Sequence, residues 1–262
     1  MKTKLFISFA ACVAASVLMS GCSKEESATT TNNNNSGPLV IVDLYSGHNY
    51  YMWDAAQNYW SGHEWDAAEA WQPTAEEETN DNYPKSNADP RWYNEGGGAF
   101  EASVNPLFNQ LPNANEMAWY ILEGDAHWDN STQWEAFGTT HTGGIWLKRL
   151  SVIAQENGKA LPDFKLTDPN GADLRTSYSS YEVSPVSGKP AASEIGKYFF
   201  LPALGYYNDG QLINFGSYGS YWSSSALPLG RSRYSYELYF ASRRVYLYNG
   251  SRYDGCLAQP FE

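Results

Sequence analysis

The chain has 262 residues and carries 29 acidic residues against 17 basic ones, which gives a formal net charge of −12. This balance disfavours nucleic acid as a partner, because affinity for phosphate backbones comes mainly from Lys and Arg. The three cysteines are too few for a fold held together by disulfides. The 10 Trp, 20 Tyr and 11 Phe instead predict a fold stabilised by aromatic packing.

The N-terminal residues 1–21 predict a lipoprotein signal peptide rather than part of a fold. The apolar run from Leu5 to Met19 is too short to span a bilayer as a folded helix. Met19-Ser20-Gly21-Cys22 resembles a bacterial lipobox, which implies acylation of Cys22; an ordinary cysteine after a cleaved signal is the alternative. Ser23-Lys24-Glu25-Glu26 resembles the signal that directs some Gram-negative lipoproteins outward. We therefore expect a lipid-anchored protein of the outer membrane that faces the cell exterior.

Residues 22–37 are rich in Ser, Thr and Asn and include an unbroken run of asparagines from Asn32 to Asn35. Such a segment cannot bury apolar area, so we expect a flexible tether. Residues 38–262 are long enough for a single domain. If Cys22 is acylated, Cys256 stands alone in that domain and no intrachain disulfide can form. No second hydrophobic run follows, so lipid is the only membrane anchor that we expect.

Several segments of the domain carry local signals of secondary structure. Leu39 to Leu44 predicts a first strand, and Thr142 to Lys148 predicts an extended segment after a Gly-Gly turn. Residues 73–98 and 155–193 are polar and punctuated by Pro and Gly, which predicts loops.

A helix is expected from Glu116 to Leu122. Asn113 or Asn115 can cap its N-terminus, because an asparagine side chain accepts a hydrogen bond from a free backbone N–H there. Gly124 can end it.

The tract from Leu227 to Asp254 alternates apolar residues with tyrosines and arginines. Period-two alternation predicts half-buried strands with one apolar face and one face of Tyr and Arg. Tyr and Arg dominate binding hot spots, so the second face is a candidate binding surface. A solvated sheet face with tyrosines packed over it is the alternative. The residues expected to point inward are Trp222, Leu238, Phe240 and Val245, and those expected to point outward are Tyr239, Arg244, Tyr246 and Tyr248.

Three blocks of the sequence carry a family resemblance. The first joins Asn115–Tyr120 with His127-Trp128-Asp129, the second is Thr142–Lys148, and the third is Tyr198–Phe261. The third block is the most specific, through Tyr198-Phe199-Phe200-Leu201-Pro202-Ala203 and Tyr221-Trp222-Ser223-Ser224. Together they resemble the major paralogous domain lipoproteins and, more closely, the variable proteins of diversity-generating retroelements. The chain departs from that family at Cys256-Leu257-Ala258-Gln259-Pro260, where the family usually ends in Val-Arg-Pro.

The resemblance implies an α+β domain with a C-type-lectin-like fold, related to the formylglycine-generating enzyme domain. Small twisted antiparallel sheets, two helices and long loops are expected of it. In the variable proteins, an error-prone copy of a template replaces the 3′ end of the gene, and the altered side chains bind a ligand from an exposed face. Many target codons of that family are of the AAC type, and adenine-directed changes at their first two bases do not yield Lys, Gln, Met, Trp or Glu. From Leu227 to Ala258 the chain has none of these types except Glu237.

We therefore predict a surface lipoprotein, not an enzyme, that binds a protein or cell-surface polymer through its tail at about 220–258. The alternatives are a non-diversified paralogous lipoprotein for glycan binding or adhesion, and an enzyme that resembles sulfatase-modifying factors. No cofactor and no metal are expected. Besides the lipidation site Cys22, the predicted ligand-binding residues are Arg231, Arg233, Tyr239, Arg243, Arg244, Tyr246, Tyr248, Asn249, Ser251, Tyr253 and Asp254.

Other chemistries have less support in the sequence. A catalytic relative with this fold needs a pair of cysteines at its site, whereas Cys256 stands alone in the tail. The four histidines lack the spacing of metal ligands. Trp128-Asp129-Asn130 resembles the calcium-binding triplet of true C-type lectins, but the partner motif Glu-Pro-Asn or Gln-Pro-Asp is missing.

Overall fold

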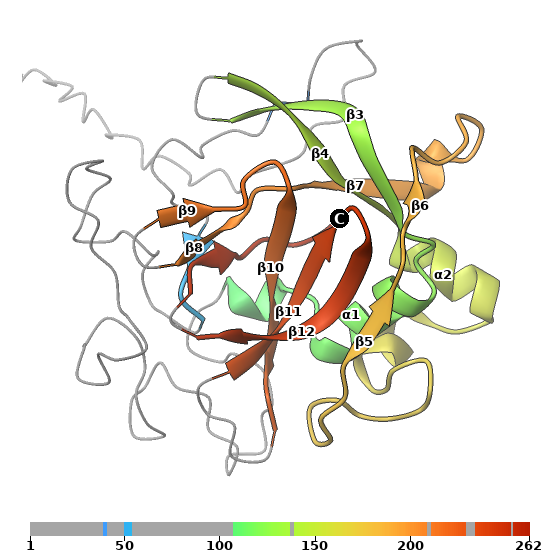
Figure 1. The fold of residues 1–262 in the computed structure, drawn as a ribbon. Coiled ribbons are helices and arrows are strands. Elements are labelled where there is room, and N and C mark those ends of the chain that lie inside the picture. Colours follow the sequence, from blue (N-terminus) through green and yellow to red (C-terminus); the bar gives the residue numbers. More distant parts are fainter. Residues whose placement is uncertain are drawn as a thin grey trace, which may run out of the picture.

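A computed structural model describes residues 50–53, 107–136, 139–208, 211–228, 234–252 and 254–262, together with the backbone of Leu39–Val40. Two sheets organise these residues (Figure 1). The first sheet contains β1 (Leu39–Val40), β3 (His127–Ala136), β4 (Thr139–Lys148) and β7 (Tyr198–Pro202), with β6 (Val186–Ser187) paired to β3. The second contains, in spatial order, β2 (Tyr50–Tyr51), β13 (Cys256–Leu257), β10 (Tyr218–Ala226), β11 (Tyr234–Ala241), β12 (Arg244–Ser251) and β5 (Tyr181–Val183). A separate hairpin pairs β8 (Tyr206–Asn208) with β9 (Gln211–Ile213).

The sheets are mixed, so the expectation of antiparallel sheets is only partly right. β1 and β6 run parallel to β3, and β13 runs parallel to β10. Each of these pairs joins strands far apart in the sequence, and a long connection lets a strand return in the parallel direction. The strand-rich α+β class is confirmed. The extended segment expected at Thr142–Lys148 is also confirmed, because it lies within β4.

The predicted helix is confirmed as α1 (Ala114–Leu122). Asn113 is its N-cap: its side chain accepts a hydrogen bond from the Glu116 backbone N–H at 3.0 Å. The Glu116 carboxylate accepts one from the Asn113 N–H at 2.9 Å. These reciprocal bonds satisfy backbone donors that a helix start leaves without partners.

The prediction of loops throughout 155–193 is wrong at four elements. α2 (Leu150–Asn157) continues into this range, and the 3-10 turn η3 (Leu161–Lys165), β5 and β6 lie within it. α2 is short: Ile153 and Ala154 are buried, Leu150 packs against the main core, and its eight residues span only about two turns. Gly158 ends it with a positive φ of 62°, which favours glycine. The described residues also form the 3-10 turns η2 (Phe108–Gln110) and η4 (Ile195–Lys197).

Of the expected first strand Leu39–Leu44, the structure shows β1 at Leu39–Val40. The rest of that segment lies outside the described residues. So do the predicted signal peptide at 1–21, the predicted tether at 22–37 and the predicted loops at 73–98.

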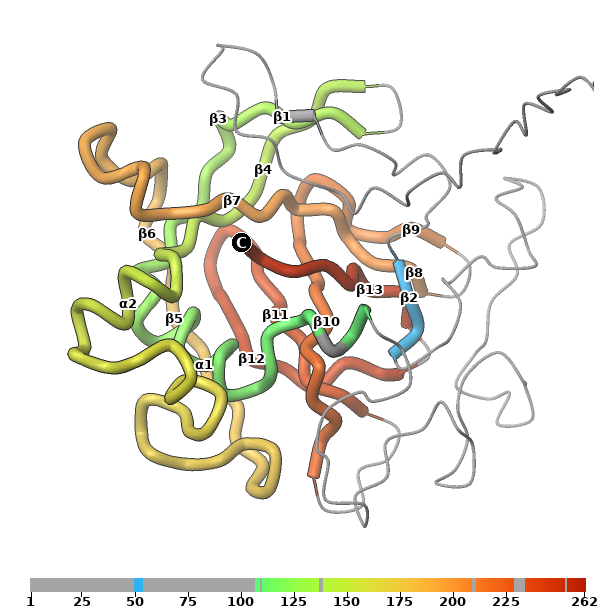
Figure 2. The backbone as a smooth tube through the Cα atoms, turned by 180° about the vertical axis from the view of Figure 1, so that it is seen from behind, coloured from blue at the N-terminus to red at the C-terminus, as the bar shows by residue number. Residues whose placement is uncertain are grey.

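The main core lies between the two sheets and α1, which crosses the second sheet on one side (Figure 2). Met117 and Ile121 of α1 are buried there with Leu238 and Phe240 of β11. The Trp128 ring of β3 lies 6.5 Å from the Phe240 ring, so one sheet packs on the other through these side chains. One face of β11 and β12 is therefore committed to packing.

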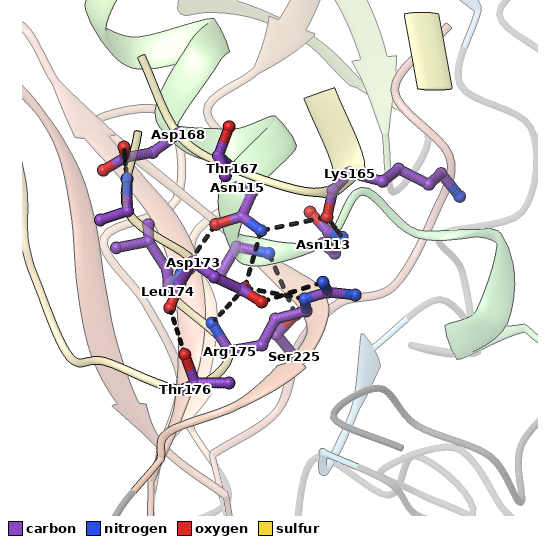
Figure 3. A network of polar contacts seen from close by, with 12 residues as sticks. Asn113, Asn115, Lys165, Thr167, Asp168, Asp173, Leu174, Arg175, Thr176 and Ser225 are labelled. Atoms are coloured by element: carbon purple, nitrogen blue, oxygen red, sulfur yellow. Dashed lines mark hydrogen bonds and ion pairs between the residues drawn. The ribbon is translucent and has the colours of Figure 1, made fainter. Parts of the chain in front are cut away.

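A polar network fixes the start of α1 against the loops around 165–175 (Figure 3). Asn115 is fully buried, and its amide nitrogen donates to the Lys165 carbonyl and to the Asp173 carboxylate, each at 3.0 Å. Its amide oxygen accepts from the Leu174 N–H at 2.8 Å. The Ser225 hydroxyl of β10 accepts from the Ala114 N–H at 3.1 Å. Because every polar atom of Asn115 has a partner, its burial is compatible with stability, and the network holds α1 against the second sheet.

Candidate functional site

Three adjacent strands, β10, β11 and β12, place alternate residues on the side of the second sheet away from α1 (Figure 1). Directly opposite residues share a side, so the register arranges these residues in rows. Ala241 lies between Tyr218 and Arg244, Tyr239 between Ser220 and Tyr246, and Glu237 between Trp222 and Tyr248. We call this side the outer face; its residues are Tyr218, Ser220, Trp222, Glu237, Tyr239, Ala241, Arg244, Tyr246 and Tyr248.

Four tyrosines of the outer face form a cluster of rings, which we call the tyrosine shelf: Tyr218, Tyr239, Tyr246 and Tyr248. Tyr239 is central, with ring centroids 5.4 Å from Tyr218 and 6.3 Å from both Tyr246 and Tyr248. Tyr248 is 48% exposed, whereas Tyr239 and Tyr246 are half-buried. Burial raises the pKa of Tyr239 to about 12, so its phenol keeps its proton at neutral pH. The shelf combines apolar ring area with hydroxyl groups that can donate and accept hydrogen bonds.

Arg244 lies against the tyrosine shelf at the start of β12. Its guanidinium carbon is 5.1 Å from the Tyr246 ring centroid and 5.7 Å from that of Tyr239. Its Nη1 donates to the Tyr246 hydroxyl at 3.4 Å. Such cation–π contacts hold a charged side chain on an exposed surface in a defined place. Arg243, in the turn before it, is also exposed.

Glu237 lies beneath the outer face and is almost completely buried. Its Oε2 accepts hydrogen bonds from the Ser220 hydroxyl and, at 3.3 Å, from the Cys256 thiol. Burial raises the pKa of Glu237, and these two hydrogen bonds offset only part of that rise. The carboxyl group is directed at Ser220 and Cys256 inside the protein rather than at solvent.

Trp222 is buried as predicted, but it lies on the outer side of the sheet rather than in the main core. A second hydrophobic cluster covers that end of the outer face and includes Trp53, Phe108 and Cys256. The Trp222 indole N–H donates to the Tyr51 carbonyl at 2.6 Å. Arg252 stacks over the Trp53 ring at 4.0 Å, so this guanidinium belongs to the cluster. Both sides of the sheet are buried here, and alternation alone cannot show that.

The structure brings five of the predicted ligand-binding residues to the outer face or its turn: Tyr239, Arg243, Arg244, Tyr246 and Tyr248. Their exposure, and the burial of Leu238, Phe240 and Val245, match the predicted sides.

Three other predicted residues lie elsewhere. Asn249 and Ser251 alternate to the opposite side, where the Asn249 side chain accepts from the Tyr178 hydroxyl at 3.3 Å. Asp254 accepts from the Asn208 amide at 2.9 Å beside the β8–β9 hairpin.

Arg231, Arg233 and Tyr253 lie outside the described residues. Tyr218 was not among the predicted residues, because it precedes the alternating tract that begins at Leu227. The same period-two alternation, continued backwards through Ser220 and Trp222, identifies it.

Asp129, from the triplet that resembles a calcium motif, is engaged within the protein. Its Oδ1 accepts from the Ser131 N–H and hydroxyl, each at 2.7 Å. Its Oδ2 accepts from Thr132 and from the Trp146 indole at 3.1 Å. Burial alone would raise the pKa of Asp129, but these hydrogen bonds outweigh it and lower the pKa to about 2. The carboxylate therefore ties a bulge of β3 to β4.

Among the described residues, no cluster of His, Cys, Asp and Glu is arranged to hold a metal ion. The helices in that part of the chain are all too short or too polar to cross a bilayer. Comparison of the chain with protein-family models, curated proteins and solved structures finds no match.

Proposed function

We propose that this chain is a surface lipoprotein with a C-type-lectin-like domain that binds a ligand through the exposed part of its outer face. One observation carries the proposal. Along the same strands, Leu238, Phe240 and Val245 are fully buried, whereas Tyr246 and Tyr248 are left half-buried or exposed. Large aromatic side chains cost stability when they are left in water, so a cluster of them beside two arginines indicates a recognition surface.

The size of the surface favours a macromolecule. A standard protein partner covers about 800 Å² on each side of an interface, and a few Tyr and Arg residues supply most of the binding energy. The side chains of the tyrosine shelf stand on a sheet rather than around a cavity, whereas small molecules are usually enclosed. The ligand that we propose is a protein or a cell-surface polymer.

The test is to pan the full chain against candidate cell surfaces beside a variant in which four outer-face residues, Tyr239, Arg244, Tyr246 and Tyr248, are replaced by Ser. The variant should lose binding and keep its fold, because the inward residues are untouched. A matched control replaces the exposed apolar residues Leu161, Leu166 and Val186, which lie outside the outer face, by Ser. Equal binding by the outer-face variant and the control, with both folded, would move the site elsewhere.

We further propose that the tail is diversified as in retroelement variable proteins. The support is the residue usage of 227–258 and the position of the tyrosine shelf on the exposed side of the strands. A near-identical, adenine-rich template and a reverse transcriptase gene beside this gene are expected. Their absence from the complete genome would favour a paralogous lipoprotein with a fixed role in glycan binding or adhesion.

The proposed anchor is Cys22, acylated and attached to the outer membrane. Radioactive fatty acid should label the wild-type protein, whereas the Cys22→Ser protein should stay unlabelled and be released from membranes. Label on the Cys22→Ser protein would refute the assignment.

A further inference from the structure

The charges around the tyrosine shelf indicate which class of ligand it binds. This inference rests on the binding function proposed above. Arg243 occupies the turn between β11 and β12, and Arg244 begins β12. Both side chains are exposed. Within the described part of the chain, neither Arg243 nor Arg244 forms an ion pair with a carboxylate. The ion pairs found there involve other basic residues. Two adjacent guanidinium groups are therefore presented to solvent without a carboxylate.

Arg244 is preorganised for an anion. The rings of Tyr239 and Tyr246 support its guanidinium from 5.7 and 5.1 Å, and one of its N–H groups reaches the Tyr246 hydroxyl. Holding a flexible side chain in place before binding reduces the entropy lost on binding. A guanidinium has five N–H donors, so most remain for a ligand, and two parallel donors fit the two oxygens of a carboxylate.

Charge is distributed unevenly around the tyrosine shelf. Glu182 of β5 lies directly opposite Tyr246 and is exposed. Glu237 is buried and hydrogen-bonded to Ser220 and Cys256, so its carboxyl group does not pair with either arginine. A negative group on the ligand is attracted to the end with Arg243 and Arg244 and repelled from the edge at Glu182. Such a pattern fixes the orientation of a partner.

The charge of the whole chain argues against a long polyanion. The chain carries a net charge of −12, which opposes the approach of a large polyanion. A nucleic acid or other extended polyanion would run beyond the two arginines, and the exposed Glu182 lies beside the shelf. One or two carboxylates beside apolar side chains fit both the guanidinium pair and the rings of the shelf.

We infer that the ligand is a protein segment that seats an Asp or Glu carboxylate on Arg243 and Arg244 and an apolar side chain on the tyrosine shelf. Arg244 stacks on the shelf, so the two subsites are contiguous and one short segment can fill both. Desolvation of the rings by the apolar side chain would also strengthen the adjacent charged contact.

The experiment selects from a library of short random peptides displayed on phage, with the full chain as bait. Three baits are compared: the wild type, Arg243→Ser with Arg244→Ser, and a control with Lys159→Ser and Lys165→Ser. The control removes the same positive charge at two exposed sites away from the outer face. A glycan array, including acidic sugars, is probed with the same three proteins.

Peptides recovered on the wild type and on the lysine control should be enriched in Asp or Glu next to aromatic or aliphatic residues. Their affinity for the arginine variant should fall by about tenfold or more, as expected for loss of a charge-assisted contact. Recovery of neutral or basic peptides, equal enrichment on the arginine variant, or no enrichment would overturn the inference. Arginine-dependent capture of acidic glycans would overturn it as well, because the ligand would then be a polysaccharide. In each of these cases, loss of cell-surface binding by the four-residue Ser variant would still uphold the proposed binding function.

Discussion

Replacing Phe240 by Ala should separate the scaffold side of β11 from its outer face. Phe240 is fully buried, its ring stacks 5.8 Å from that of Tyr221, and it lies over Gly219, where a Cβ would come within 2.1 Å of it. A buried Phe→Ala change removes apolar contacts and leaves a cavity, at a cost of about 3–5 kcal/mol. In a domain of this size, 1 kcal/mol shifts the melting temperature by roughly 2–4 °C, so a fall of roughly 6–20 °C is expected.

The matched change is Tyr246→Ala, six residues along on the outer face. Tyr246 is only half-buried and its removal leaves no core cavity, so the change should cost under about 1 kcal/mol and lower the melting temperature by no more than a few degrees. Thermal unfolding followed by circular dichroism, and urea unfolding followed by tryptophan fluorescence, measure both proteins. If Tyr246→Ala were the more damaging change, the strand register would be wrong, because a slip of one residue exchanges the two sides of a strand.

Three further predictions concern buried polar groups. Since the pKa of Glu237 is raised from 4.5, its contribution to stability is present below pH 4.5 and is lost as the pH rises through the raised value. Urea unfolding at a series of pH values should show that Glu237→Gln loses less stability than the wild type as the pH rises. The same dependence of stability on pH in both proteins would contradict the burial of the carboxyl group. For Asp129, whose pKa is about 2 rather than 3.8, stability of about 2 kcal/mol should be lost as the pH falls from about 4 to 2, and Asp129→Asn should lack this loss. Asn115→Ala should lower the free energy of unfolding by about 1–3 kcal/mol, because it leaves the buried partners of the amide without hydrogen bonds. An unchanged free energy of unfolding would show that the network does not stabilise the fold.

Local signals predicted the parts of the fold that depend on neighbours in the sequence. Asn113 was one of two candidate caps for the start of α1, and alternation indicated β11 and β12. α2 was missed because its eight residues span only about two turns, too few for a clear apolar repeat.

The pairing of strands that are distant in the sequence was harder to predict. The parallel pairing of β13 with β10, and of β6 with β3, depends on segments that the sequence places far apart. The burial of Trp222 on the outer side depends on a second cluster built in part from residues near position 50.

The candidate site was predicted where strand periodicity decides the side of a residue, as for Tyr239, Arg244, Tyr246 and Tyr248. The prediction was wrong for Asn249 and Ser251. They were included in the site because they are polar, but the alternation of β12 places them on the side opposite the outer face. Alternation places Glu237 on the outer face, but its burial depends on Ser220 and Cys256, which other strands bring beside it. Residue type suggested the function of the surface, but strand register determined which residues share it.

The most direct measurement is deep sequencing of the 3′ end of this gene across a natural population that descends from one cell. If the outer face is a diversified recognition surface on a fixed scaffold, substitutions should concentrate at Tyr239, Arg244, Tyr246 and Tyr248. The inward codons of the same strands, those for Leu238, Phe240, Val245 and Leu247, should stay unchanged. Equal substitution on both sides of the strands, or an invariant tail throughout the population, would contradict the account.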